Sequence, residues 1–269
     1  MTEAWLLSRG PEVLFFGLLL SAARPLAFIF VLPLFTRFGL QQGLIQGAVM
    51  VAFAAPVFPG VTADLQVLPP IPIAELSVLL AKELLIGLIL ALILGLPLWA
   101  VVAAGDIVDM QRGASMATIV DPGSGEDNTV TGTLFFLITA LILVTSGWFT
   151  EVLLESLYGT YQTWPVLSPL PALTPEAAEG GLILLDNLLE TGIVLSIPLL
   201  APLLLAEIAL ALAGRYTQQI NVMFVAMSLK QVLYVLIMPI YFGSLIYYVQ
   251  GEIRDLGGTG GIMEGFLNP

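Results

Sequence analysis

The apolar stretch LSVLLAKELLIGLILALILGLPLWAVVAA, residues 76–104, decides the fold class of this chain. Lys82 and Glu83 are its only charged residues. A helix that crosses a membrane needs about 20 predominantly apolar residues, and this stretch exceeds that length. It therefore predicts a membrane helix.

The composition of the whole chain agrees with this prediction. Of the 269 residues, 58% are hydrophobic and only 10% are Asp, Glu, Lys or Arg, whereas soluble domains average about 25% charged residues. So few charges could not cover the surface of a water-soluble fold of this size. The predicted fold class is an all-α, membrane-associated protein built of kinked helical hairpins.

Other apolar runs are further candidate membrane segments, at 13–35, 44–59, 130–150, 182–213 and 222–249. Their lengths are uneven, and several contain proline: Pro25, Pro198, Pro202 and Pro239. A proline inside a helix removes a backbone hydrogen bond, and in lipid the freed backbone groups must be satisfied by protein or by water in a cavity. Two interpretations remain open: broken helices within a larger helical assembly, and the ordinary kinks that are frequent in membrane helices. The first run has no basic start and is too long for the core of a signal peptide, so we expect it to be retained.

Two proline-rich connectors, residues 60–75 and 164–175, are predicted to be extended. At the end of the second, Thr174 and Pro175 are typical of a helix start, with Thr as the N-cap and Pro in the first turn. This connector divides the chain into a larger N-terminal part, residues 1–165, and a helical hairpin, residues 166–250. The glycine-rich residues 251–269 are expected to form a flexible tail.

Net charge and residue types exclude several classes of function. The net charge is −12 and the eight basic residues are scattered, which argues against nucleic acid as a partner. The chain contains neither Cys nor His, so thiol nucleophiles, imidazole bases and the usual zinc and haem ligands are missing. We therefore expect no catalytic, cofactor-binding or metal-binding residues, no cofactor, and a protein that is not an enzyme.

Charged residues that lie within or beside apolar runs need an explanation; they include Arg24, Lys82, Glu83, Glu207 and Lys230. A charge that faces lipid costs roughly 2.5–3.5 kcal/mol on insertion scales, so these side chains are expected to face protein, water or one another. A proton or ion relay and interhelical ion pairs that fix an assembly are both open. Lys82 and Glu83 are neighbours in sequence, about 100° apart on a helix, and are therefore not expected to pair with each other.

A polar loop, residues 105–125, follows the stretch 76–104 and begins GDIVDMQRGASMAT. Five acids and one arginine lie between residues 106 and 127 of a chain that otherwise avoids charge. If the helix continues past residue 104, Asp109 and Arg112 are spaced for an i, i+3 pair. The loop is therefore the first place to look for function.

Glycine and proline indicate where this loop bends. Pro122 disfavours the α conformation in the residue before it, so the helix must end before Pro122. Gly105, Gly113 and Gly123 are predicted to act as hinges around two short pieces. Ser115 has no base beside it to make it a nucleophile, and the loop lacks the lysine of a phosphate-binding loop. A gate, a plug or a contact with a partner fits the loop better than catalysis.

The wording of residues 105–117, followed by Asp121-Pro122, resembles the signature of the type III secretion export-gate family, whose members are the flagellar FliR and the injectisome SctT-type proteins. Further matches are Ala23-Arg24-Pro25, Lys82 to Gly87, Ala201-Pro202, Arg215, Gln219 to Val222 and Met227 to Lys230. The matches cover about residues 20–250, nearly the whole chain. At Gln218 and Ser228 the chain departs from the family, which often carries proline there.

This resemblance implies a non-enzymatic subunit of an export gate. One copy would join several copies of the P/R-type and Q/S-type subunits in a closed helical ring, the entrance channel for unfolded export substrates. A switch protein of the FlhB/SctU type would be a further partner. Residues 1–165 would correspond to a P-type subunit and residues 166–250 to a Q-type hairpin. The expected location is the bacterial inner (cytoplasmic) membrane, in contact with lipid and within the basal body of the secretion system.

The resemblance also implies roles for individual residues. The polar loop resembles the family's plug, which occludes the pore beneath the ring, and its plug residues would be Asp106, Asp109, Met110, Gln111, Arg112, Gly113, Ser115 and Met116. We interpret the pair Asp109–Arg112 as a latch, and Met110 and Met116 as soft apolar stoppers. Charges at subunit interfaces would be Arg24, Lys82, Glu83, Glu207 and Lys230. The wording of the loop favours an injectisome over a flagellum.

A second function remains open from the sequence. A stand-alone secondary transporter could use intramembrane charges at its midplane, namely Arg24, Glu83, Glu207 and Lys230. It would be a stable monomer or small homo-oligomer with saturable uptake of a small solute. An export-gate subunit, in contrast, would be poorly stable without its partners.

Overall fold

The computed structural model describes residues 11–40, 43–68, 71–113, 119–120, 127–168, 175–216 and 222–257. These residues form helices, turns and one short ribbon, so the predicted all-α fold class is confirmed. The α-helices are α2 (Pro11–Val31), α3 (Pro33–Arg37), α4 (Gly43–Ala54), α5 (Phe58–Val67), α6 (Ile73–Arg112), α7 (Val130–Thr145), α8 (Glu155–Thr163), α9 (Pro175–Gly214) and α10 (Val222–Gly257). A π-helix, η2 (Phe149–Leu154), precedes α8, and β1 (Ile119–Val120) pairs antiparallel with β2 (Asp127–Asn128).

The chain divides into two compact units made of interleaved segments. Unit 1 comprises Met1–Gly95, Thr150–Ala178 and Met263–Pro269, and unit 2 comprises Leu96–Phe149 and Glu179–Ile262. The chain therefore passes from one unit to the other within α6, within η2 and in the first turn of α9. The predicted division into a P-type part and a Q-type hairpin concerns likeness to other subunits, and it stays a prediction. Of the predicted flexible tail, residues 251–257 belong to helix α10, and residues 258–269 lie outside the described residues.

Long apolar helices confirm the membrane character of the chain. Four helical segments in the described residues are long and apolar enough to cross a membrane: Pro11–Val31, Ile73–Arg112, Leu189–Gly214 and Val225–Gly251. Two bent pairs could each count as one more span. They overlap two of the predicted runs, the short run 44–59 and the run 130–150: α4 and α5 meet at 66°, and α7 meets the helix Phe149–Thr163 at 77°.

The predicted extended connector over residues 60–75 is wrong for most of its described part. Residues 60–67 belong to α5, which begins at Phe58 and has a proline in its first turn. Proline is tolerated there because the first N–H groups of a helix have no partner within the helix. Of the second connector, residues 164–168 form a turn in which Ser168 N donates to Pro165 O at 3.1 Å, and Thr174 lies outside the described residues. α9 does begin at Pro175, as predicted.

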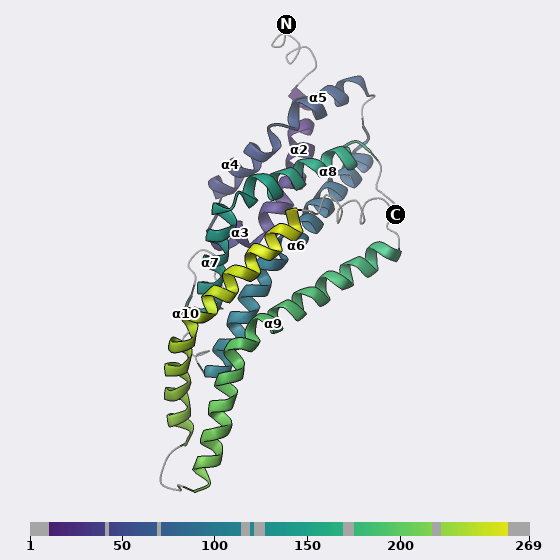
Figure 1. Ribbon diagram of the computed structural model, residues 1–269. Helices are drawn as coiled ribbons and strands as arrows, with labels where there is room; N and C mark the ends of the chain where they lie inside the picture. Colours follow the sequence, from purple (N-terminus) through teal and green to yellow (C-terminus); the bar gives the residue numbers. More distant parts are fainter. Residues whose placement is uncertain are drawn as a thin grey trace. The chain divides into compact units, whose positions relative to one another are not determined.

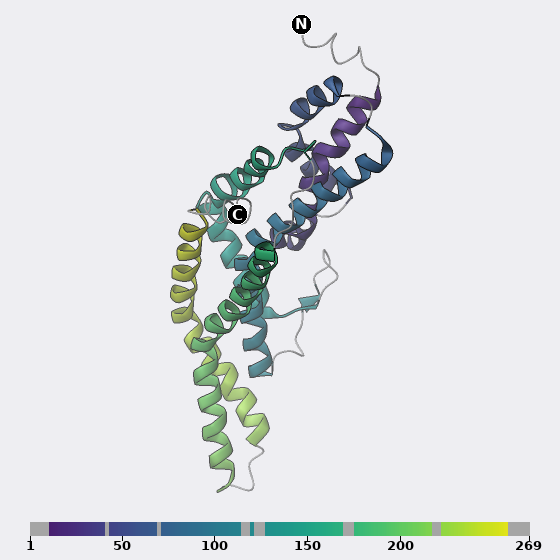
Figure 2. The same ribbon diagram turned by 90° about the vertical axis from the view of Figure 1, so that its right-hand side faces the viewer.

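Proline residues lie inside four of the long helices, at Pro25, Pro97, Pro198, Pro202 and Pro239. Each removes one hydrogen bond from the backbone ladder of its helix. Within unit 2, both α9 and α10 are visibly bent along their length in two views at right angles (Figures 1 and 2).

Unit 1 is built around α2. Helices α4 and α5 pack against it, and a small core of Leu20, Val61, Leu79 and Val166 joins α2, α5, α6 and the turn after α8. Gly87 of α6 lies against the backbone carbonyl of Arg24, where a side chain would not fit. The absence of a side chain at Gly87 therefore lets α6 approach α2 closely, as small residues do in membrane helix pairs.

Unit 2 contains the C-terminal half of α6 together with α7, α9 and α10. Helix α10 buries one face along its length, formed by Lys230, Tyr234, Met238, Tyr241, Leu245 and Val249. On this face, Tyr241 donates to the carbonyl of Leu195 on α9 at 2.9 Å and stacks on Phe135 of α7 with ring centroids 5.1 Å apart. The opposite face is apolar and exposed, with Ile240 79% and Tyr247 81% accessible.

Helices α6 and α7 cross through two glycines. A Cβ atom placed on Gly105 would lie 2.5 Å from both the Cα and the N atom of Gly132. The prediction of a hinge at Gly105 is therefore wrong: α6 runs unbroken through this residue, whose missing side chain allows close packing instead. Gly123 lies outside the described residues.

Replacing Gly105 with alanine is expected to destabilise the protein by about 1–3 kcal/mol, because the added methyl group would push two backbones apart. The measurement is the thermal unfolding of the purified protein in detergent. Gly159→Ala in α8 is the matched control, since a Cβ atom there meets nothing within 4 Å, and it should stabilise by about 0.4–1 kcal/mol. Equal unfolding midpoints for the two variants would show that the crossing is not tightly packed.

Candidate functional site

The polar loop begins as a direct continuation of α6. Helix α6 extends to Arg112 and therefore carries the first five of the predicted plug residues. It ends at Gly113, whose φ of 75° is the left-handed conformation that glycine adopts readily at a helix C-terminus. Two of the predicted residues, Ser115 and Met116, lie outside the described residues.

Asp109 and Arg112 form the predicted i, i+3 ion pair at the end of α6. Arg112 Nη2 lies 2.6 Å from Asp109 Oδ1, and both side chains are almost fully buried, at 8% and 1% accessible. The second carboxylate oxygen of Asp109 accepts from the backbone N–H of Thr131 on α7 at 2.9 Å, and the hydroxyl of Thr131 donates to the same carboxylate. The pair is thus joined to the first turn of the next helix.

Two residues of α10 complete this cluster. Arg112 Nη1 donates to Gln231 Oε1 at 2.8 Å, and the Arg112 guanidinium lies over the ring of Tyr234, 4.0 Å from its centroid. The hydroxyls of Tyr234 and Thr131 are hydrogen-bonded at 2.8 Å. We call Asp109, Arg112, Thr131, Gln231 and Tyr234 the α6-end cluster; it joins α6, α7 and α10.

Sequence reasoning missed Thr131, Gln231 and Tyr234. A weak signal was present on α10, because Tyr234 follows the predicted residue Lys230 by four positions and therefore shares its helix face. Nothing in the sequence indicates Thr131, an ordinary threonine in the first turn of an apolar helix.

A further contact closes the base of the polar loop. Thr129, the N-cap of α7, accepts from the backbone N–H of Gly132 at 3.0 Å and donates to Asp106 Oδ1 at 2.5 Å. Asp106 and Asp109 therefore each hold the residues that follow the loop. Both ends of the loop are pinned together by buried or half-buried hydrogen bonds.

Two of the predicted interface charges, Glu207 and Lys230, form an ion pair with each other beside the α6-end cluster. Lys230 Nζ lies 2.7 Å from Glu207 Oε2 and donates to the backbone carbonyl of Gln111 at 3.0 Å. Gln111 Nε2 donates to the same Glu207 oxygen at 2.9 Å. Met110, by contrast, is 70% exposed.

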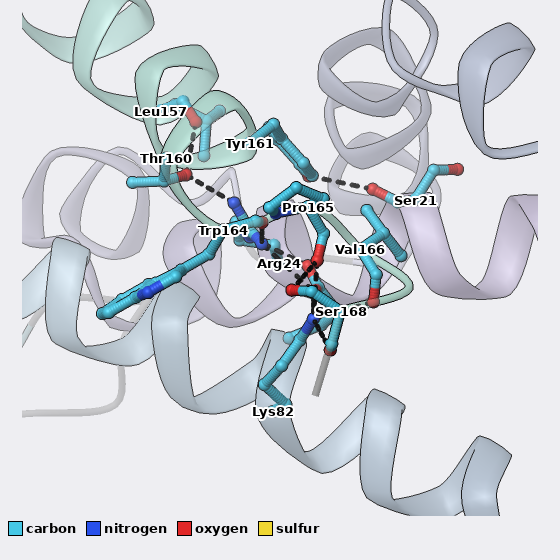
Figure 3. A network of polar contacts seen from close by, with 11 residues as sticks. Ser21, Arg24, Lys82, Leu157, Thr160, Tyr161, Trp164, Pro165, Val166 and Ser168 are labelled. Carbon is cyan, nitrogen blue, oxygen red and sulfur yellow. Dashed lines mark hydrogen bonds and ion pairs between the residues drawn. The ribbon is translucent and has the colours of Figure 1, made fainter. Parts of the chain in front are cut away.

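The remaining three predicted charges, Arg24, Lys82 and Glu83, meet in unit 1, and Figure 3 shows Arg24 and Lys82 with their hydrogen-bond partners. Arg24 of α2 donates to both oxygens of Glu83 on α6, from Nε at 2.8 Å and from Nη2 at 3.1 Å. It also donates to Thr160 Oγ1 at 2.7 Å and to the carbonyl of Trp164 at 3.0 Å, while its guanidinium lies 3.9 Å from the centroid of the Tyr161 ring. Each of the three guanidinium nitrogens of this fully buried arginine therefore donates to at least one acceptor, which offsets the cost of burying it.

Lys82 fixes the turn that follows α8. Its ammonium donates to the carbonyls of Pro165, Val166 and Ser168, at 2.9, 2.7 and 3.1 Å, and Figure 3 shows it pointing at this turn. It also lies 3.0 Å from Glu83 Oε1, so the prediction that these neighbours do not pair is wrong. The lysine stem is long enough to bend toward a carboxylate that Arg24 holds in place, and helical spacing alone does not forbid that.

The five predicted interface charges thus have partners within the chain, which supports interhelical ion pairs over a relay. Their assignment to subunit interfaces stays a prediction. Within the described ranges, no group of three or more acidic side chains is placed to hold a metal ion. What the two clusters can do is hold helix ends and turns in place.

Comparisons with known proteins cover most of the chain. The family described as "Bacterial export proteins, family 1" matches residues 15–256. The chain is 32% identical over 218 residues to Yop proteins translocation protein T of Yersinia pestis, which covers 81% of this chain and 82% of that protein. It is 29% identical over 236 residues to secretion system apparatus protein SsaT of Salmonella typhimurium, covering 86% and 89%. It is also 31% identical over 190 residues to flagellar biosynthetic protein FliR of Bacillus subtilis, covering 70% and 73%.

Proposed function

Because this chain belongs to family 1 of the bacterial export proteins, the FliR/SctT family of type III export apparatus, we propose that it is a subunit of the export gate. It assembles with P/R-type and Q/S-type subunits into a closed helical channel, the entrance for unfolded export substrates. The apolar helices make it a membrane-embedded component. The inner membrane, within the basal body, is the proposed location, and a switch protein of the FlhB/SctU type is a further proposed partner.

The polar loop is the proposed plug of this channel. The observation that carries the proposal is the pinning of both loop ends by Asp106, Asp109 and Arg112. A segment that blocks a pore must be held in position against the passing substrate, and the α6-end cluster supplies such a support. The exposed Met110 is an adaptable apolar side chain of the kind that suits a seal.

The family comparison and the exposed helix faces support an assembly over a stand-alone transporter. The candidate spans Leu189–Gly214 and Val225–Gly251 are only 22% and 28% buried within the chain. As a Q-type hairpin, they are the proposed contact with neighbouring subunits. Purification with and without those subunits tests this: the chain alone is expected to be poorly stable, whereas saturable solute uptake by the purified chain alone would favour a transporter.

The relatives named for secretion, such as SsaT, match more of this chain than FliR does, and we propose that it serves an injectisome.

Deleting residues 114–118 is expected to leave assembly intact and to make the membrane leak ions several-fold faster. This deletion removes part of the proposed plug but spares Arg112, whose loss would leave the buried Asp109 without its charge partner. The measurement is ion conductance or dye leakage in cells and vesicles that contain the assembled complex.

A deletion of equal length at 258–262, outside the loop, is the control, and copurification with the partner subunits checks assembly. If the assembled 114–118 deletion conducts no more than wild type, the polar loop is not the plug.

A further inference from the structure

Two kinds of contact hold the end of α6, and they differ in burial. The α6-end cluster is closed to solvent: the Asp109 and Arg112 side chains are 1% and 8% accessible, and Thr131 is fully buried. The neighbouring contact is open on one side, because the Glu207 side chain is 49% accessible while Lys230 is 10% accessible. The helices involved also differ, since the α6-end cluster uses α7 and α10, whereas Glu207 comes from α9.

Burial determines which of these contacts can break. Separating a buried ion pair leaves charges without water, and typically shifts an equilibrium by more than about a hundredfold. A half-exposed pair exchanges its partner for water, and its loss shifts an equilibrium by about two- to fivefold. The α6-end cluster is therefore the fixed contact, and Glu207 makes the weak one.

Lys230 can lose Glu207 without being left unpaired. Its ammonium also donates to the backbone carbonyl of Gln111, one of the last carbonyls of α6, where a positive charge is favoured by the helix dipole. The side chain of Gln111 donates to Glu207 from a neutral amide. Separating Gln111 from Glu207 therefore leaves no buried charge on Gln111 without a partner.

Within the chain, few buried contacts hold α9 after Leu203. Its last well-buried residue is Leu203, at 1% accessible, and residues 204–214 are exposed or half-exposed. Exposed apolar side chains here include Leu205 at 67% and Ile208 at 56%. In Figures 1 and 2 this end of α9 runs beside the start of α10, away from the rest of unit 2. Glu207 is the acidic residue that ties this arm of α9 to α6 and α10.

We propose that Glu207 is a releasable strap that holds the α9 arm, residues 204–214, against the end of α6. On this proposal, which rests on the proposed gate function, the arm must part from Gln111 and Lys230 before substrate passes. The α6-end cluster stays intact and serves as the fixed base of the polar loop. The releasable contact therefore lies at Glu207, and not at the pair Asp109–Arg112.

A cleavable cross-link between α6 and α9 tests the strap directly. The chain has no native cysteine, so Gln111→Cys with Glu207→Cys places two unique thiols at side chains whose tips touch, 2.9 Å apart. In the assembled apparatus in cells, a short disulfide-containing bifunctional maleimide is expected to stop export, and a reductant is expected to restore it. Neither single-cysteine variant can form the link between α6 and α9, so the reagent should leave the export rate of each unchanged relative to the same variant without reagent.

Removing the negative charge of Glu207 tests the same contact without a cross-linking reagent. Glu207→Gln should raise ion leakage or the export rate by about two- to fivefold, as expected for the loss of a half-exposed pair. Glu190→Gln is the matched control, an exposed acid on the same helix outside the strap, and should behave as wild type.

The outcomes separate the strap from the plug. Export that continues at an unchanged rate through the cross-linked pair, or equal leakage of the Glu207→Gln and Glu190→Gln variants, overturns the strap. If the 114–118 deletion leaks in the same assay, the plug survives that result. If the deletion does not leak, the proposed plug fails, whatever the cross-link does.

Discussion

Replacing Glu83 with alanine is expected to prevent folding rather than to weaken the protein slightly. Glu83 is the common partner of two buried cations, Arg24 at 2.8 and 3.1 Å and Lys82 at 3.0 Å. None of the three is more than 1% accessible. Breaking a buried pair by removing one partner costs about 3–5 kcal/mol, and here two cations lose it at once. A typical domain is stable by only about 5–15 kcal/mol.

The measurement is the yield of folded chain and its thermal unfolding in detergent, together with copurification of partner subunits. Glu75→Ala is the matched control, since Glu75 is an exposed acid in the first turn of the same helix, and it should cost less than about 1 kcal/mol. A double variant, Arg24→Ala with Glu83→Ala, should be less destabilised than the sum of the two single changes, because the pair acts as one unit. A Glu83→Ala chain as stable as the Glu75→Ala chain would contradict this account.

Replacing Asp109 with alanine is expected to release the base of the polar loop. The change leaves the Arg112 guanidinium without its carboxylate and the backbone N–H of Thr131 without its acceptor. A loss of about 3–5 kcal/mol follows for a buried pair. Because the same carboxylate joins α6 to α7, the loop ends should separate. The variant is therefore expected to leak ions as well as to unfold more easily.

Hydrogen exchange distinguishes this local release from general unfolding. Amides of residues 105–113 and 129–132 should exchange faster in Asp109→Ala, while those around the Arg24–Glu83 pair in unit 1 keep their protection. Asp186→Ala removes an exposed acid from α9 and serves as the control. Unchanged protection at the end of α6 would mean that Asp109 does not hold the loop.

Arg112→Lys would show what the arginine geometry contributes. Lysine keeps the charge but cannot donate along a planar fork to Asp109, Gln231 and Thr131 while stacking on a tyrosine ring. Partial loss of the loop-base protection is therefore the expected intermediate result between wild type and Asp109→Ala.

Two of the three errors of sequence reasoning share one physical cause. The first error has a local cause, because the prolines within residues 60–75 favoured an extended connector although residues 60–67 lie before them and form most of α5. Helical spacing separated Lys82 from Glu83, yet a third residue, Arg24, brings them to one point. Gly105 was expected to bend the chain, yet Gly132 packs against it. In the last two cases a contact distant in sequence overrode a local preference.

The sequence by itself determined the fold class and the family. Lipid leaves a chain no way to satisfy its backbone except helices or closed barrels, so 58% hydrophobic residues in long runs, with 10% charge, already specify membrane helices. It also indicated which charged residues have structural partners. A charged side chain within an apolar run needs a partner or water to offset the cost of burying it.

Only the tertiary structure shows which residues those charged side chains contact. Arg24 finds Glu83 across 59 residues and Thr160 across 136, and Arg112 finds Gln231 across 119. The pattern of apolar residues indicates that a charged side chain is buried, but it does not indicate which residue the side chain contacts. Any well-placed acceptor satisfies a buried donor equally well. The accessible fractions of the side chains also distinguish the buried pair Asp109–Arg112 from the half-exposed contact of Glu207. Residue types alone do not indicate this difference.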